Sequence, residues 1–245
     1  MRIAICSDIH ANLEALQAVL ADIRDVECAK VFCCGDVVGY GGSPNECCEL
    51  LRENSIFTVR GNHDAAAVSD EPVPEEFNPT AAESMAWTRE QLTAANRSWL
   101  RSLPLVKVER ILGLTLCHAA PENPADWMYL PSPALARGSF AILETPVAFI
   151  GHSHAGAMFW MEADGHIMMV PPCVIRMRPG ERYLVNVGSV GQPRDHDHRA
   201  SYFIYDTDDG ILAPRRVEYA LEEAQRKILA AGLPHKLAER LELGR

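Results

Sequence analysis

Short apolar runs alternate with amphipathic segments along the first part of the chain. Three runs are short enough for buried strands, at residues 3–6, 31–34 and 56–59. Between the first two, apolar side chains recur at helical spacing over residues 13–23, and Ser43 followed by Pro44 is typical of a helix start. The order strand, helix, strand, helix, strand predicts parallel strands joined by right-handed crossovers.

The pattern changes after residue 64. Residues 65–80 are rich in proline and are predicted to be irregular, and residues 81–103 read as one or two helices, which makes 65–103 a helical insertion. Further on, turns such as Ala163-Asp164-Gly165 join apolar runs into hairpins. The strands predicted in this part are residues 106–109, 112–117, 147–150, 157–162, 166–170, 183–187, 201–205 and 211–218. Helices at 221–231 and after Pro234 follow, and we predict one domain over residues 1–245 with two packed sheets and helices outside.

The chain is acidic, with 23 Lys and Arg against 33 Asp and Glu and a formal net charge of −10. This balance argues against an extensive nucleic-acid surface or an anionic-membrane surface, both of which need clustered basic residues. The acidic balance is compatible with small anionic substrates, because bound metal ions can make the local electrostatic potential positive. The eight cysteines include no CxxC pair, and no apolar stretch is long enough for a signal peptide or a membrane span. We therefore predict a cytoplasmic protein with no membrane partner.

Candidate metal ligands follow five of the predicted strands. They are Asp8 and His10, Asp36, the run Asn62-His63-Asp64, His118, and the pair His152 and His154. If the backbone is extended there, Asp8 with His10, and His152 with His154, each point to one side. Taken singly, Asp-x-His is common by chance, the run after Gly61 is more typical of a turn, and His118 of a structural histidine, whereas the pair His152 and His154 fits a metal ligand equally well. Five such motifs, each after an apolar strand, favour a site for first-row divalent metals over calcium.

This ordered series resembles the calcineurin-like metallophosphoesterases, and most closely their small bacterial and archaeal branch of phosphodiesterases and phosphatases. The resemblance covers about residues 1–205 and includes the segments 7–13, 35–41 and 187–195. It implies a four-layer αββα sandwich of two mixed β-sheets flanked by helices. It also implies a site for two divalent transition-metal ions, for which Mn, Fe, Ni, Co and Zn are all chemically acceptable.

The resemblance also implies a role for each candidate. Asp8, His10 and His154 would hold the first metal, Asn62, His118 and His152 the second, and Asp36 would bridge the two. His63 would be the general acid; its side chain would point away from that of Asn62 if the segment is extended, and an exposed turn histidine is the alternative. Arg194 is a candidate phosphate clamp, although a surface ion pair with Asp195 fits the sequence equally well.

One departure from the family bears on the substrate. The protein-phosphatase branch has an Asp and then an Arg after the bridging Asp, whereas this chain has Val37-Val38-Gly39-Tyr40. We therefore predict a dinuclear metal-dependent hydrolase of small phosphodiesters or nucleotide-type substrates, acting by attack of metal-activated water with His63 as acid. The alternatives are a nuclease, which the acidic charge disfavours, and a metal-binding interaction scaffold like a retromer subunit of the same fold. Aromatic residues of the insertion, including Phe77, are predicted to pack rather than bind, and nothing in the sequence specifies an oligomeric state.

Overall fold

The computed structural model describes residues 1–75 and 77–245, and within them the strands form two mixed sheets of six strands each. The first sheet has the order β3 (Phe57–Thr58), β2 (Lys30–Cys33), β1 (Arg2–Cys6), β11 (Ala200–Asp206), β12 (Ile211–Val217) and β9 (Ile175–Arg176). The second has the order β4 (Val106–Glu109), β5 (Leu114–Cys117), β6 (Val147–Ile150), β10 (Arg182–Asn186), β7 (Ala157–Met161) and β8 (Ile167–Val170).

Strands β1, β2 and β3 run parallel, whereas β11 lies antiparallel to β1, with Ile3 opposite Tyr205 and Ile5 opposite Phe203. The predicted hairpins are present as the antiparallel pairs β7–β8 and β11–β12. In the second sheet β6 is central and parallel to both β5 and β10. The candidate ligands follow the carboxyl ends of β1, β2, β3, β5 and β6.

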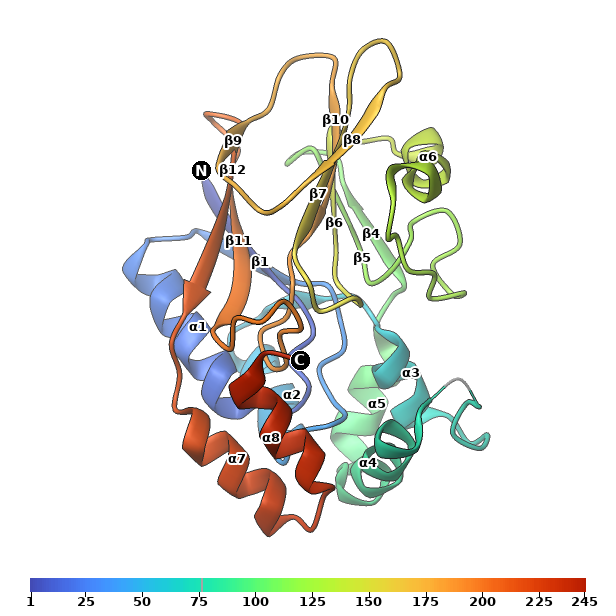
Figure 1. Ribbon diagram of the computed structural model, residues 1–245, viewed down its shortest axis with the longest axis vertical. Helices are drawn as coiled ribbons and strands as arrows, with labels where there is room; N and C mark the ends of the chain where they lie inside the picture. Colours follow the sequence, from blue (N-terminus) through green and yellow to red (C-terminus); the bar gives the residue numbers. More distant parts are fainter. Residues whose placement is uncertain (76) are drawn as a thin grey trace.

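Helices cover the outer face of each sheet (Figure 1). Helices α1 (Leu13–Asp25) and α2 (Pro44–Glu53) lie along the first sheet, and α6 (Pro133–Ile142) lies along the second. Helices α3 (Asn62–Val68), α4 (Pro79–Gln91) and α5 (Ala94–Ser102) form a separate group below the second sheet in this view. The chain finishes with α7 (Leu221–Ala230) and α8 (His235–Leu243), which pack against each other near α1. None of the described helices combines the length and apolar character needed to cross a membrane.

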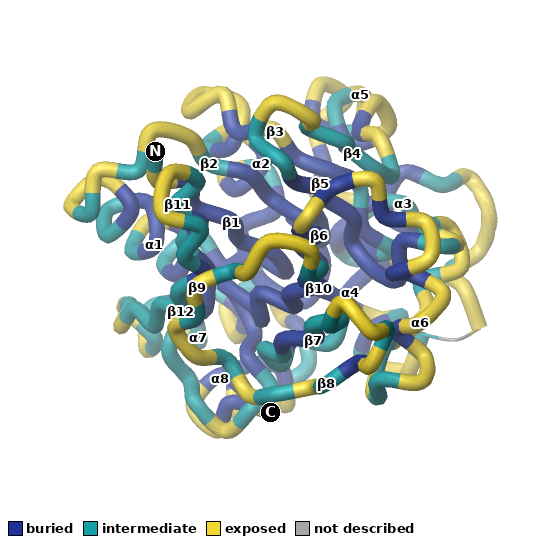
Figure 2. The backbone as a smooth tube through the Cα atoms, turned by 90° about the horizontal axis from the view of Figure 1, so that it is seen from above, coloured by how far each residue is buried: buried dark blue, intermediate teal, exposed yellow. Residues whose placement is uncertain are grey.

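The side chains of β1 alternate between the two faces of the first sheet, so this strand contributes to two apolar layers. In β1, Ile3 and Ile5 pack into the apolar layer between the sheets, whereas Ala4 and Cys6 face α1 and α2. All four residues have no exposed surface. Figure 2 shows the same arrangement from above, with buried strands at the centre and exposed loops around them. The sandwich predicted from the sequence is therefore confirmed.

Two local predictions were wrong. Residues 65–80 are not wholly irregular, because helix α3 starts at Asn62 and continues to Val68. Helix α6 was not predicted at all, although Ser132 and Pro133 carry a helix-start signal. Gly138 weakens the helical pattern of that segment, and packing of Ala136 and Phe140 under the second sheet stabilises it instead.

Candidate metal centre

The loops that follow β1, β2 and β6 adopt left-handed backbone conformations at the candidate ligands. The φ angles are 53° at Asp8, 48° at His10, 53° at Asp36, 70° at His152 and 60° at His154. The expected extended backbone is therefore wrong at these residues, although Asp8 and His10 still lie together, with 3.8 Å between Asp8 Oδ1 and His10 Nε2. Non-glycine residues rarely adopt positive φ, and such strain is concentrated at functional sites.

One group of donors contains Asp8, His10 and His154, whose ligand atoms all lie within 4.8 Å of one another. The Nε2 atoms of His10 and His154 are 2.9 Å apart, and Asp8 Oδ1 is 3.4 Å from His154 Nε2. All three residues are buried. The group therefore brings together one carboxylate and two imidazoles from the loops after β1 and β6.

A second group contains Asp36, His118 and His152. Asp36 Oδ2 lies 3.3 Å from His118 Nε2 and 3.6 Å from His10 Nε2, so this carboxylate is shared between the two groups. Asn62 joins the second group, because its Oδ1 lies 3.1 Å from His118 Nε2. His154 and His152 thus belong to different groups, although only Ser153 separates them.

The ring orientations show what the donors can bind. The Nδ1 atoms of His10, His118 and His154 face the carbonyl oxygens of Val38 at 3.1 Å, Cys34 at 2.8 Å and Gln192 at 2.7 Å. A carbonyl only accepts, so each Nδ1–H donates and the Nε2 of a neutral ring carries a lone pair. Two such lone pairs face each other between His10 and His154, and His152 Nε2 is buried without a hydrogen-bond partner among the described residues. Cations between these atoms would satisfy them, so the donor set fits divalent metals.

Burial also favours the ligating form of three imidazoles. It lowers the pKa of His10 and His154 well below the ordinary value and that of His152 to about 3. Burial opposes the charged form of His118 too, but the Asp36 carboxylate raises the pKa of His118 to about 9. Neutral imidazole is the form that binds metal, so burial prepares His10, His152 and His154 for that role.

Asp64 anchors the loop that carries Asp36, a role that sequence reasoning missed. Its carboxylate accepts backbone N–H groups of Asp36 and Val37 at 2.8 Å each, of Gly61 at 3.0 Å and of Val38 at 3.3 Å. Asp64 is fully buried at the third position of α3, and Gly61 is the helix N-cap. The signal was present, since an acidic residue three positions after an N-cap is typical of a capping box.

His63 is buried in the first turn of α3, so the expected extended segment is wrong there. On a helix, neighbouring side chains are directed about 100° apart, which still separates His63 from Asn62. The His63 ring lies 4.6 Å from Tyr40, 4.7 Å from Phe77 and 4.8 Å from His10, measured between ring centroids. Burial lowers the pKa of His63 to about 4, although the Asp36 carboxylate opposes this. Aromatic packing therefore holds this imidazole, and Phe77 lies at the site rather than within a remote core.

Comparison with known proteins gives the family. Residues 1–210 match the calcineurin-like phosphoesterase superfamily domain. The chain belongs to this superfamily. A metallophosphoesterase of known structure from Sphaerobacter thermophilus is 38% identical, with a TM-score of 0.86 over 100% of this chain and 99% of that one.

Two relatives known from sequence extend the comparison. An uncharacterized protein of Methanocaldococcus jannaschii is 42% identical over 99% of this chain and 98% of its own length. A symmetrical bis(5'-nucleosyl)-tetraphosphatase of Nitrosococcus oceani is 31% identical, over 60% of this chain and 52% of the relative. The chain thus matches about half the length of that tetraphosphatase. Membership of the calcineurin-like superfamily makes this chain a phosphoesterase, a hydrolase whose fold uses divalent metals.

The phosphoesterase site opens into a cavity of about 740 Å³ beside the second donor group. Asn62, His63 and His152 line one part of it, and Phe77, Trp127, Tyr129 and Arg194 line the rest. Arg194 Nη2 donates to Gln192 Oε1 at 2.8 Å, whereas the Asp195 carboxylate pairs with Arg216. The alternative ion pair between Arg194 and Asp195 is therefore not formed, and Arg194 faces the cavity.

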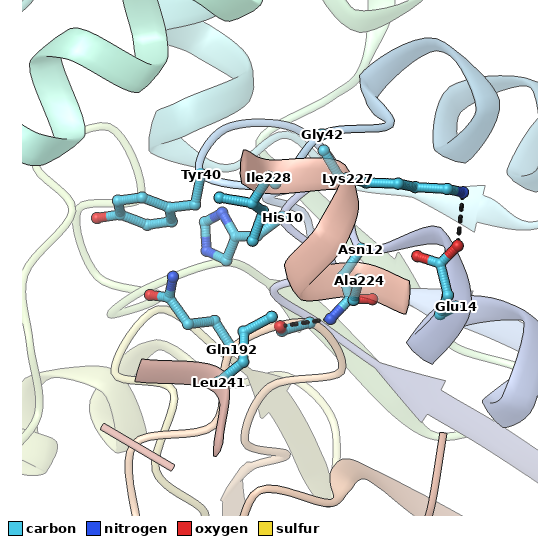
Figure 3. Close-up of a pocket in the computed structure, with 13 residues that line it drawn as sticks. His10, Asn12, Glu14, Tyr40, Gly42, Gln192, Ala224, Lys227, Ile228 and Leu241 are labelled. Carbon is cyan, nitrogen blue, oxygen red and sulfur yellow. Dashed lines mark hydrogen bonds and ion pairs between the residues drawn. The ribbon is translucent and has the colours of Figure 1, made fainter. Parts of the chain in front are cut away.

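A second, much smaller space lies beside His10 (Figure 3). Its volume is about 10 Å³, enough for roughly one water molecule. Tyr40, Gln192 and Leu241 surround His10 on one side, and the ion pair between Lys227 and Glu14 lies on the other. Helices α7 and α8 thus close the back of the site.

Proposed function

We propose that the chain is a dinuclear metal-dependent hydrolase of small phosphodiesters and nucleotide-type substrates. The observation that supports this most directly is the position of Asp36, whose carboxylate is shared by two groups of metal-ligating side chains. In this proposal Asp8, His10 and His154 hold one ion, and Asn62, His118 and His152 hold the other. Bound divalent ions would polarise phosphoryl oxygens and acidify water, which is the chemistry that ester hydrolysis needs.

His63 and Arg194 complete the proposed site. His63 is the general acid that protonates the leaving oxygen, since it lines the cavity next to Asn62. Its low pKa means that the ring is neutral before substrate binds, and an anionic phosphate close to it would favour proton uptake. Arg194 binds a phosphate oxygen through its guanidinium, because it faces the same cavity without a carboxylate partner among the described residues.

Three features support small diesters or nucleotides over phosphoproteins. The cavity of about 740 Å³ has the size of typical small-molecule sites. The stretch Val37-Val38-Gly39-Tyr40, which follows Asp36, contains neither the Asp nor the Arg of the protein-phosphatase branch. The relative from Nitrosococcus oceani is named for hydrolysis of a dinucleoside polyphosphate.

The test combines metal content with an activity panel. After reconstitution with Mn, Fe, Co, Ni or Zn, we expect two ions per chain and a higher kcat/KM on nitrophenyl diesters than on phosphopeptides. Asp36→Asn should reduce occupancy of both ions, whereas Asp209→Asn, in an exposed turn, should keep both. One ion in a fully active protein would defeat the dinuclear assignment, and faster hydrolysis of phosphopeptides would defeat the substrate choice.

We also propose a cytoplasmic location. All eight cysteines are free thiols in the described structure, and burial raises the pKa of several of them, including Cys34, Cys47 and Cys48, well above the ordinary value. Adjacent buried thiols suit a reducing compartment. Fractionation of cells that express the tagged chain would check this, and recovery outside the cytoplasm would refute it.

A further inference from the structure

Two arginines from distant parts of the chain meet beside Tyr40. Arg194 lies in the loop between β10 and β11, and Arg240 lies on α8. Both donate to the same oxygen, Gln192 Oε1, at 2.8 Å from Arg194 Nη2 and 3.2 Å from Arg240 Nη1. Their guanidinium carbons also lie near the Tyr40 ring, 5.7 and 6.0 Å from its centroid. Two like charges therefore converge on one neutral acceptor.

These guanidinium groups lack anionic partners in the described part of the chain. The Asp195 carboxylate pairs with Arg216, and the Nε–H groups of Arg194 and Arg240 are buried without a hydrogen-bond partner in residues 1–75 and 77–245. The chain as a whole carries ten more acidic than basic side chains, so carboxylates are abundant elsewhere. Adjacent, desolvated arginines repel each other, and burial together with Arg194 lowers the pKa of Arg240. An anion between them would remove this repulsion and satisfy the free donors.

The two arginines differ in their distance from the metal donors. Arg194 lines the open cavity and acts electrostatically on His10, His63 and His154. Arg240 does not line that cavity, and its guanidinium contacts Gln192 and the Tyr40 ring instead. A ligand that contacts both arginines therefore needs a second negatively charged group in addition to the phosphate at the metal donors. A simple diester has no such charge, whereas a phosphate joined to the scissile one through an anhydride has it.

We propose that Arg240 and Arg194 together bind a second phosphate of the substrate, so that the enzyme selects compounds with an anhydride-linked phosphate chain over simple diesters. This inference rests on the phosphoesterase function proposed above and adds a specificity-determining residue to it. Arg240 lies outside residues 1–210, the part that matches the superfamily domain. The selectivity is therefore a contribution of the carboxyl-terminal helices of this chain.

The test compares AMP with ADP, which differ by one anhydride-linked phosphate. Binding of each to the metal-loaded full chain is measured by calorimetry and as inhibition of nitrophenyl diester hydrolysis. Arg240→Met keeps the aliphatic stem against Tyr40 but removes the guanidinium. The matched control is Arg226→Met on α7, whose guanidinium is exposed and pairs with Glu223. Both variants change the net charge equally.

We expect Arg240→Met to weaken ADP binding by about 10- to 100-fold and AMP binding by less than about 3-fold. Arg226→Met should change neither, and Arg240→Lys should fall between wild type and Arg240→Met. Metal content and thermal unfolding of each variant are measured on the same samples. Should Arg240→Met fold poorly, the ADP-to-AMP ratio of Arg240→Lys decides the question.

Two results would overturn the proposal. Equal losses for AMP and ADP would place Arg240 at the phosphate common to both. Unchanged ADP binding would make Arg240 a packing residue of α8. A third outcome separates this proposal from the proposed hydrolysis. If Arg240→Met weakens only ADP binding in calorimetry, and the wild-type protein hydrolyses no diester, the anion site is supported and the proposed hydrolysis is contradicted.

Discussion

Gly39 allows a direct test of how His63 is positioned. Gly39 has a φ of +89°, and a Cβ atom added there would lie 2.5 Å from His63 Nδ1 and 3.2 Å from His63 Cγ. Ordinary contacts between such atoms are about 3.5 Å, so in Gly39→Ala the imidazole must retreat by about 1 Å. A misplacement of this size costs roughly 10²-fold in rate when the displaced group takes part in the chemistry.

Gly180 provides the matched control. It has a φ of +85°, but an added Cβ there would meet nothing within 4 Å. Both substitutions therefore carry the same backbone strain, about 1 kcal/mol for an alanine in this conformation, and only Gly39→Ala displaces His63. Thermal unfolding should shift at least as much in Gly39→Ala, where the buried imidazole is also displaced, and metal content should stay at the wild-type level in both variants.

The assay is kcat/KM on a diester with a nucleoside leaving group. We expect Gly39→Ala to lose about 10²-fold and Gly180→Ala less than about 2-fold. In a His63→Ala background, Gly39→Ala should cause no further loss, since there is no imidazole to displace. Equal activities of Gly39→Ala and Gly180→Ala, or full additivity with His63→Ala, would show that the position of His63 does not matter for the reaction.

Three further predictions concern His63, Asp64 and Asp22. His63→Ala should keep both metals and lose about 10²- to 10⁴-fold on alkoxide leaving groups but much less on nitrophenolate; equal losses on both would remove the acid role. Asp64→Asn leaves two of the four backbone N–H groups without an acceptor, so urea unfolding should show a loss of about 2–6 kcal/mol, against almost none for Asp209→Asn. Burial raises the pKa of Asp22, but the hydrogen bonds from Arg215 and Tyr202 lower it further, so the folded pKa lies below the unfolded pKa of about 4. The stabilisation from Asp22 is therefore complete above the unfolded pKa and is lost as pH falls through the lower folded value. Asp22→Asn should therefore unfold more easily than wild type at pH 7, and the difference should shrink at pH 2–3; a constant difference would contradict this.

The two-sheet sandwich could be predicted from the sequence because the apolar runs mark the strands and the candidate ligands follow directly after them. Each candidate ligand comes within a few residues after a strand, and adjacent parallel strands bring such loops to one edge of a sheet. Residues far apart in the chain, such as Asp8 and His154, could therefore be expected to meet. The helix at Asn62 was missed because the short run Asn62–Val68 is too brief to show helical periodicity, and a buried carboxylate rather than propensity fixes its start.

The grouping of the ligands could not be predicted from spacing. An extended backbone would have placed His152 beside His154, but left-handed conformations at both turn the two rings toward different carboxylates. Nothing in the local sequence signals these conformations, since histidine and aspartate adopt them only where the surroundings require it. The role of Arg240 was likewise invisible, because its approach to Arg194 depends on how α8 packs over Tyr40.

The left-handed conformations of the ligand residues are imposed by the ligand loops themselves, which hydrogen-bond to one another. Asp8 N–H donates to Gly35 O at 2.9 Å, and His10 N–H donates to Asp36 O at 3.0 Å, so the loops after β1 and β2 fix each other. The Asp8 carboxylate also accepts the His152 N–H, which joins the loop after β6. The strained conformations are thus maintained by backbone bonds that do not involve a metal. Donors held in this way lose little freedom when ions bind, which favours affinity and selects ions whose geometry fits the existing arrangement.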